Sequence, residues 1–166
     1  MAEALLINKT DLVKFTALNG NVDADKFIQY VKIAQDIEIQ NILGTRLLNK
    51  IKDDIENATL TGNYLTLVTD YIKPVLIHWA MSRYLPWAAY TIANKGVYKH
   101  GAENSESVDK SEVDFLVEKE RQTAQDYTQR LQDYICFNQT LFPEYNENTN
   151  ADVSPDSDNY FSGWVL

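Results

Sequence analysis

The sequence predicts an all-α fold: a bundle of about four helices, preceded by a short N-terminal helix and followed by an extended C-terminal tail. Apolar residues recur at spacings of three and four along most of the chain, and no segment shows the sustained alternation of a half-buried strand. Six glycines and four prolines in 166 residues favour long helices over many turns. With 45% hydrophobic and 23% charged residues, the chain is typical of a globular domain with its own core.

Caps and turns delimit the first two predicted helices. The stretch Asn8–Asp11 is typical of a helix start, and the short helix that follows ends at Asn19–Asn21. Asp23 or Asp25 caps a second helix, whose apolar residues mostly follow the spacing of an amphipathic helix. Gly44 is placed to end that helix, because glycine is the usual residue just past a helix C-terminus.

Two more helices follow, and the second is the longest of the chain. Thr45 begins the third predicted helix, which ends before a turn at Thr59–Asn63. The pattern from Tyr64 to about Ala93 predicts a long helix that is apolar nearly all round in its second half, as in a central helix wrapped by others. Pro74 and Pro86 should bend or break it, because each lacks a backbone donor.

The last third of the chain combines a loop, a helix and a tail. Val97–Lys110 is predicted to be a polar loop, and Ser111 starts a final helix that ends near Asn138. The composition then changes after Tyr145, so we predict a bundle domain over residues 1–145 and an extended acidic tail over 146–166. The tail begins with a polar linker of 14 residues, Asn146–Asn159, in which only Ala151 and Val153 are apolar and which spans roughly 45 Å when extended.

The charge is negative overall and is concentrated at the C-terminal end. The net charge is −9, and six acidic residues but no Lys or Arg follow Arg130. A net charge of this sign argues against a protein that binds nucleic acid through a basic face. The most apolar stretch, Val75–Ala93, carries Arg83 near its middle, which makes insertion into a membrane costly. We therefore expect no membrane span and no specific binding to DNA.

No set of residues in the sequence predicts catalysis or a cofactor. One cysteine and two histidines supply no zinc ligand cluster, and no glycine-rich phosphate-binding motif occurs. His78 is interpreted as a core histidine with an internal partner, His100 as a solvated loop residue and Cys136 as a structural thiol. The acidic residues between Asp152 and Asp158 lack the glycine and distal glutamate of a calcium loop. We expect a protein that is not an enzyme and binds neither cofactor nor metal.

The end of the tail predicts contact with a protein. An apolar tip follows the polar linker, and a free tail gains nothing from aromatic residues. The tip either folds back onto its own bundle or docks on another chain, and docking agrees with the preference of interfaces for Trp and Tyr anchors. The candidate partner-binding residues of the tip are Tyr160, Phe161, Trp164, Val165 and Leu166.

The order of these features resembles the head–tail connector (adaptor) proteins of tailed bacteriophages, in particular those of phages infecting Bacteroidetes, including crAss-like phages. The resemblance extends over almost the whole chain, through short motifs in a common order. The motifs are Asn21-Val22-Asp23, Ala34-Gln35-Asp36, Ile42-Leu43-Gly44, Tyr71-Ile72-Lys73-Pro74, Asn94-Lys95-Gly96-Val97, Phe142-Pro143-Glu144-Tyr145 and the end that contains Trp164.

The resemblance implies a structural role in the virion. Such proteins form a ring, commonly of twelve subunits, between the portal protein and a downstream neck or tail protein, and they continue the channel through which DNA leaves. The implied location is the neck of the virion, after assembly in the cytoplasm of the bacterial host. By position, the segment from Tyr145 to the C-terminus would embrace the portal or a neighbouring subunit. A possible channel or inter-subunit loop contains Tyr98, Lys99, His100, Glu103 and Glu106.

Two alternatives remain open at this stage. The chain could be another phage neck or tail-completion protein. It could also be a bacterial helical regulatory module that binds a peptide or a small acid in a groove near Trp79, Arg83 and Trp87. The alternatives differ in stoichiometry, because a connector forms high-order rings and a regulatory module is a monomer or dimer.

Overall fold

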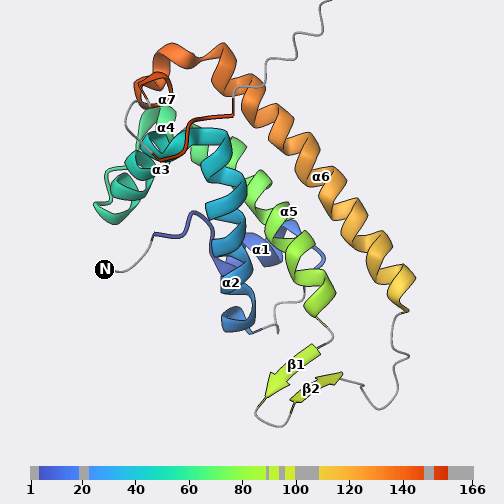
Figure 1. Cartoon of the computed structure of the whole chain (residues 1–166). Helices are drawn as coiled ribbons and strands as arrows, with labels where there is room; N and C mark the ends of the chain where they lie inside the picture. Colours follow the sequence, from blue (N-terminus) through green and yellow to red (C-terminus); the bar gives the residue numbers. More distant parts are fainter. Residues whose placement is uncertain are drawn as a thin grey trace, which may run out of the picture.

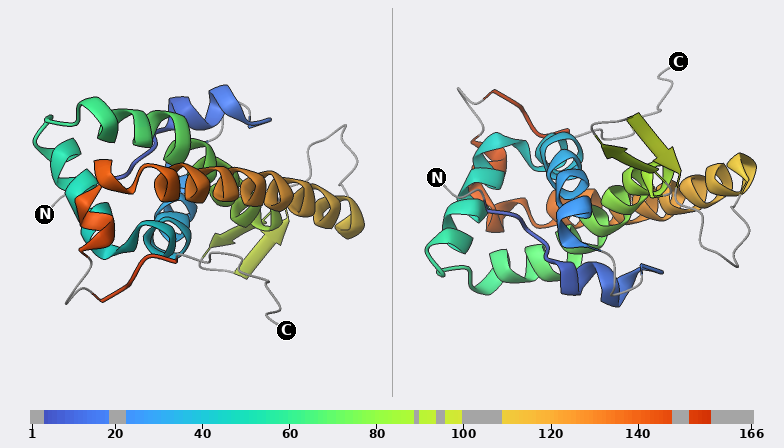
Figure 2. Two further views of the ribbon diagram at one scale, coloured as in Figure 1. Left: turned by 90° about the horizontal axis from the view of Figure 1, so that it is seen from above. Right: turned by 90° about the horizontal axis from the view of Figure 1, so that it is seen from below.

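The computed structural model shows the predicted all-α fold, with one small β-hairpin added (Figure 1). It describes residues 4–18, 23–88, 90–93, 96–99, 109–147 and 152–156. Three helices form the body: α2 (Ala24–Ala34), α5 (Lys73–Tyr84) and α6 (Lys110–Phe137). α5 contacts both α2 and α6 extensively and lies between them (Figures 1 and 2). The first helix, α1 (Lys9–Phe15), packs against α5.

The remaining elements lie mainly at the two ends of this body. At one end are α3 (Gln40–Glu56), α4 (Gly62–Thr66), a 3₁₀ turn (Gln139–Leu141) and α7 (Pro143–Asn146). At the other end, a 3₁₀ turn (Leu85–Trp87) leads into the hairpin of β1 (Tyr90–Ala93) and β2 (Gly96–Lys99). The strands are antiparallel, with Tyr90 opposite Lys99 and Ala93 opposite Gly96.

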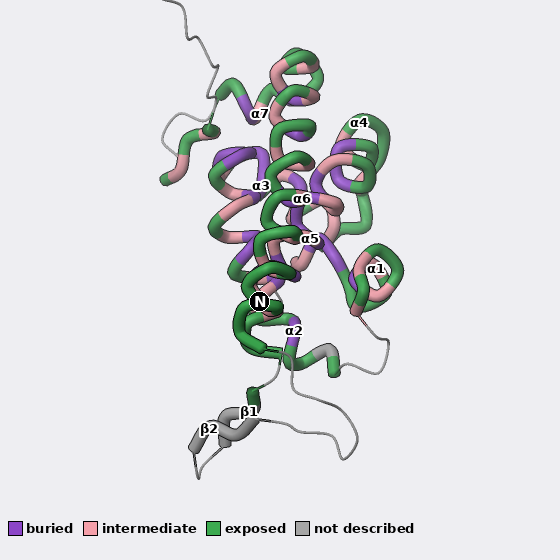
Figure 3. Tube along the Cα trace, turned by 90° about the vertical axis from the view of Figure 1, so that its right-hand side faces the viewer, coloured by how far each residue is buried: buried purple, intermediate pink, exposed green. Residues whose placement is uncertain are grey.

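α5 is the central helix, as its all-round apolar composition predicts. Val75, Leu76 and Ala80 are fully buried, and the buried positions lie on several sides of the helix. By contrast, α6 is exposed along much of its length and buries only one narrow stripe (Figure 3). A helix buried on one stripe keeps its polar residues on the opposite face, which is the pattern that the α6 sequence shows.

Two π-helical turns interrupt the longer helices. Gln35–Ile39 joins α2 to α3, and Leu67–Ile72 joins α4 to α5. In the first turn, the fully buried Gln35 side chain accepts a hydrogen bond from the Leu6 amide at 3.0 Å and donates one to the Ala4 carbonyl at 3.1 Å. A buried amide is stable only when it is paired, so Gln35 fixes the N-terminal segment against the bundle.

Polar pairs bind the central helix to its neighbours. His78 Nδ1 lies 2.7 Å from Glu120 Oε2, and the His78 ring stacks on Tyr127 of α6. Lys73 pairs with Asp11 of α1 at 3.0 Å. These contacts agree with the interpretation of His78 as a histidine with an internal partner.

The long helix predicted from Tyr64 to Ala93 is shorter in the structure. The helical part ends at Trp87, because Pro86 cannot continue the hydrogen-bond ladder, and residues 90–93 form β1 instead. The predicted polar loop from Val97 accordingly begins with β2. Pro74 falls in the first turn of α5, where a missing N–H is tolerated, so it does not break the helix.

The predicted helix starts agree closely with the structure. Asn8 and Asp11 form a capping box at α1, and Asp23 caps α2. α6 begins one residue before the expected Ser111, with Asp109 as its cap. None of the helices in the described residues combines the length and the apolar composition that a membrane span requires.

Candidate functional site: the C-terminal clip

A sharp bend at Gly44, here called the elbow, divides α3 into two parts. Gly44 is buried and has φ 75° and ψ 160°, a conformation that is essentially restricted to glycine. In an unbroken α-helix the Thr45 amide would donate to the Asn41 carbonyl four residues earlier. The elbow separates these two groups and leaves each of them without its partner within the helix.

Residues 152–156, here called the C-terminal clip, supply both missing partners. The Thr45 amide donates to the Val153 carbonyl at 3.0 Å, and the Asp156 amide donates to the Asn41 carbonyl at 2.7 Å. The segment thus supplies a partner to each of two backbone groups that the elbow separates. Because an unpaired backbone group costs free energy when it is away from water, this exchange stabilises the bend.

Side chains add to the attachment of the clip. The Thr45 hydroxyl donates to the Asp152 carboxylate and accepts from the Val153 amide at 3.2 Å. This contact lowers the pKa of the Asp152 carboxyl, since a hydrogen bond favours the charged form. Next to Thr45, the Arg46 guanidinium donates to the Glu147 carbonyl, so the chain is held on both sides of residues 148–151.

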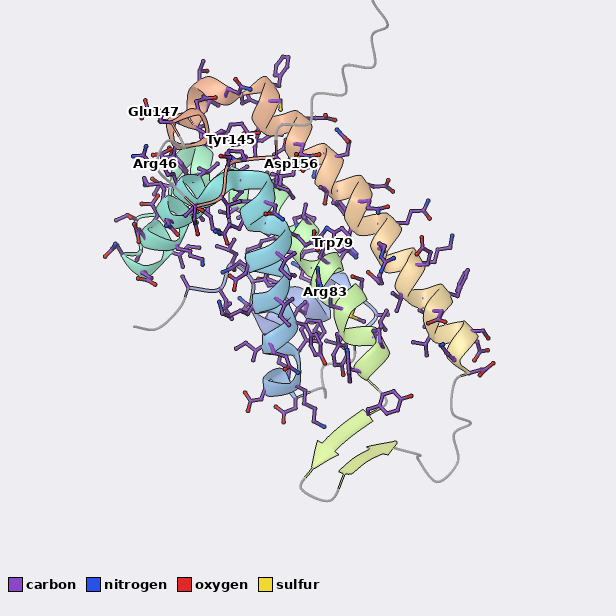
Figure 4. All side chains as sticks on the ribbon, viewed as in Figure 1. Arg46, Trp79, Arg83, Tyr145, Glu147 and Asp156 are labelled. Carbon is purple, nitrogen blue, oxygen red and sulfur yellow. The ribbon has the colours of Figure 1, made fainter. Side chains whose placement is uncertain are left out.

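Pro155 fits directly against Gly44. A Cβ at Gly44 would lie 2.8 Å from Cγ and Cδ of Pro155, well inside contact distance. Two independent requirements therefore favour glycine at position 44. Its backbone angles disfavour any residue with a Cβ, and a Cβ would overlap the Pro155 ring. Figure 4 shows Asp156, Tyr145 and Arg46 together at this end of the molecule.

Tyr145 belongs to the core of its own chain, which corrects the expectation that it binds a partner. Its side chain is only 6% exposed and packs within the central hydrophobic cluster. A hydrogen bond joins it to Cys136, which is half-buried. Burial, the Cys136 thiol and the Asp156 carboxylate raise the pKa of Tyr145 to about 12. A buried ring cannot embrace another protein while the bundle is folded.

Alkaline pH should weaken the fold through Tyr145. Its folded pKa lies above the ordinary value of 10, so its contribution to stability is complete below pH 10 and is lost as the pH rises towards 12. We expect the urea midpoint to fall over this range, and to fall less in the variant Tyr145→Phe, which has no hydroxyl to ionise. An equal fall in both proteins would contradict this assignment. Because the chain has ten tyrosines, the difference in tyrosinate absorbance between the wild type and Tyr145→Phe during the titration measures this group independently.

The other predicted site residues lie largely outside the described part of the chain. This applies to the tip residues Tyr160, Phe161, Trp164, Val165 and Leu166, and to His100, Glu103 and Glu106 of the expected channel loop. Tyr98 and Lys99 are in β2, and only their backbone is described. Within the predicted tail, the described residues 152–156 are attached to the bundle at the elbow.

Exposed aromatic and large apolar side chains mark both ends of the molecule, which sequence patterning did not reveal. Trp87 and Tyr90 lie where α5 passes into the hairpin, and both are about half exposed. Phe137 and Leu141 lie at the opposite end, where α6 stops (Figure 1). Phe115 and Leu116 are exposed in the first turns of α6. Helical spacing does not show where a helix extends past its neighbours, so it cannot identify such residues.

The groove considered for a small ligand is occupied by internal contacts. The Trp79 indole donates to the Thr128 hydroxyl at 3.1 Å, and Arg83 pairs with Glu38 of the first π-helical turn. Both side chains therefore connect helices (Figure 4). Among the described residues, no three His, Cys, Asp or Glu side chains are grouped to hold a metal ion.

Comparison with known proteins places the chain in one family. No curated protein and no solved structure matches it. A family model does match residues 39–155, a range that begins just before the elbow and ends within the clip. The matched range thus contains both Gly44 and Pro155. It covers more than half of the sequence, and the chain accordingly belongs to DUF6712, a family of unknown function.

Proposed function

We propose that the protein is a structural component of a tailed-phage virion, a ring-forming head–tail connector between the portal and the tail. The observation that carries this proposal is the placement of exposed aromatic side chains at two opposite ends of the helical body. Trp87 and Tyr90 lie at one end, and Phe137 lies at the other. A subunit with a partner above it and a partner below it needs an apolar contact at each end.

The charge of the chain supports the same function. A net charge of −9 per subunit would keep DNA from adhering to the wall of a channel made of many copies. The order of sequence motifs noted above adds a resemblance to connector proteins. In this proposal the neighbours are further copies of the chain, the portal, and a downstream neck or tail protein.

A small-ligand module is less well supported by the described residues. The apolar cavity between the N-terminal segment and α2 has a volume of about 80 Å³ and is lined by residues that include Leu12, Phe27 and Val31. Small-molecule sites usually measure roughly 300–1,000 Å³. A cavity of this size has no room for a peptide or for most small acids. Two hollows of about 480 and 310 Å³ are large enough, but both are open to solvent and neither is lined by Trp79, Arg83 or Trp87.

Cross-linking mass spectrometry on purified virions tests the proposed function. We expect cross-links between copies of this chain and from this chain to the portal. Cross-links to the tail tube or a stopper protein, with none to the portal, would indicate another neck component instead. Absence of the chain from virions would exclude a connector altogether, and sedimentation of the purified protein as a monomer or dimer that binds a small molecule would favour a regulatory module.

A further inference from the structure

Phe137 is the most exposed large apolar side chain among the described residues. It is the last residue of α6 and is 92% exposed, and Leu141 in the following 3₁₀ turn is also exposed. Its neighbour Cys136 faces Tyr145 and the core, so Phe137 projects from the end of a helix whose position is fixed. An exposed aromatic ring at the end of a packed helix is the type of residue that anchors protein interfaces.

The chain around this ring is acidic. The 36 residues from Leu131 to Leu166 contain six acidic side chains and no Lys or Arg. Asp133 lies four residues before Phe137, which places both on one face of α6. Glu147 and Asp156 lie at the same end of the molecule (Figure 4).

Three basic residues of α3 and α6 near this end of the molecule have partners within the chain. Arg46 donates to the Glu147 carbonyl, and Lys50 pairs with Asp54. On α6, Arg130 donates to the Asp70 carbonyl at 2.8 Å and lies over the Tyr71 ring. Hydrogen bonds to carbonyls leave the charges of Arg46 and Arg130 in place, so the negative charge at this end comes from the chain that follows Arg130. Residues 131–156 carry five acidic side chains and no Lys or Arg.

This charge distribution limits what can cover Phe137. Nucleic acid and anionic lipid both repel an acidic surface. A second copy that used the same end would place like charges against each other, which is unfavourable at an interface. An apolar pocket with a basic rim on another protein satisfies both the ring and the charge.

The name α6 end patch is used here for Phe137 and Leu141 together with Asp133 on the same face of α6 as Phe137. We propose that this patch docks into an apolar pocket rimmed by Lys and Arg on a partner protein. In the connector function proposed above, that partner is the portal. The choice of the portal as a probe therefore rests on the proposed function, whereas the chemistry of the patch does not.

The test compares two serine variants of the full-length chain for binding to the purified portal protein. Phe137→Ser removes the anchor, and Phe115→Ser is the matched control: the same residue type on the same helix, 60% exposed, near its other end. We expect Phe137→Ser to weaken binding by about 30-fold, as for loss of an interface hot spot. The control should bind like the wild type, and wild-type affinity should fall as salt is added. Both variants should unfold at the wild-type temperature, since neither side chain is buried.

A photo-reactive benzoylphenylalanine in place of Phe137 tests the end patch without assuming the partner. It forms a covalent adduct with whichever molecule contacts position 137 in virions. If the portal does not bind wild-type protein, the connector function fails. The end patch still stands if the probe forms an adduct in virions with an apolar residue flanked by Lys or Arg on an identified neighbour. The proposal is overturned if Phe137→Ser binds the portal like wild type, or if the adducts lie only within the chain, on another copy or on nucleic acid. It is equally overturned if no adduct forms.

Discussion

Replacing Gly44 with alanine is expected to destabilise the fold by about 3 kcal/mol or more. The backbone at φ 75° and ψ 160° is strained for any residue with a Cβ, at a cost of about 1–3 kcal/mol. The new methyl group would also meet the Pro155 ring at 2.8 Å, so the clip must move away. Displacing the clip exposes its hydrogen bonds to Asn41 and Thr45, which adds to the loss.

Gly62→Ala is the matched control for this prediction. Gly62 also has a positive φ, of 58°, but an added Cβ would have no atom within 4 Å. We expect it to cost about 1 kcal/mol, the backbone penalty alone. Urea unfolding of the two variants measures the difference, and equal losses would show that contact with Pro155 contributes nothing.

Ending the chain at Glu147 should destabilise the fold by about 2–3 kcal/mol, whereas ending it at Asp156 should have little effect. Both truncations remove the apolar tip Tyr160–Leu166, but only the first removes the clip. Loss of the clip leaves the Thr45 amide and the Asn41 carbonyl without their partners, and each such hydrogen bond contributes about 0.5–1.5 kcal/mol. Burial lost at the half-buried Val153 and Pro155 accounts for the rest.

Thermal unfolding of the two truncated chains distinguishes the clip from a passive linker. If the two truncated chains unfold at the same temperature, the clip has no structural role. Addition of a synthetic peptide with the sequence of residues 148–156 should recover part of the loss, since the elbow would still offer the same two backbone groups.

The sequence predicted the helices better than the contacts between distant segments. Spacing and capping residues located α1, α2 and α6, because these signals are local. Gly44 was correctly predicted to end a helix. The residues that stabilise the bend were missed, because the clip has the composition of a linker and acts mainly through its backbone. Backbone hydrogen bonds depend little on residue type, so a pattern of side chains does not predict them.

Two other differences have similar physical causes. The hairpin strands are four residues each, too short to show the alternation that identifies a strand. Phe137 was not singled out from the sequence, because it lies off the apolar stripe of α6 on the face that carries Asp133, and only the structure shows that it is 92% exposed. For the candidate site, the sequence predicted an aromatic tip on a tail, and the structure adds the point at which that tail is attached.

The clip also sets the order in which the molecule can be completed. A ribosome makes the chain from its N-terminus at about 5–20 residues per second, so Val153 emerges several seconds after Thr45, from which it is separated by 108 residues. During that interval the clip cannot yet pair with the Thr45 amide and the Asn41 carbonyl, so water must hydrogen-bond to them instead. The bend therefore acquires these two partners only after Val153 and Asp156 have left the ribosome, and a chain terminated before that point lacks them.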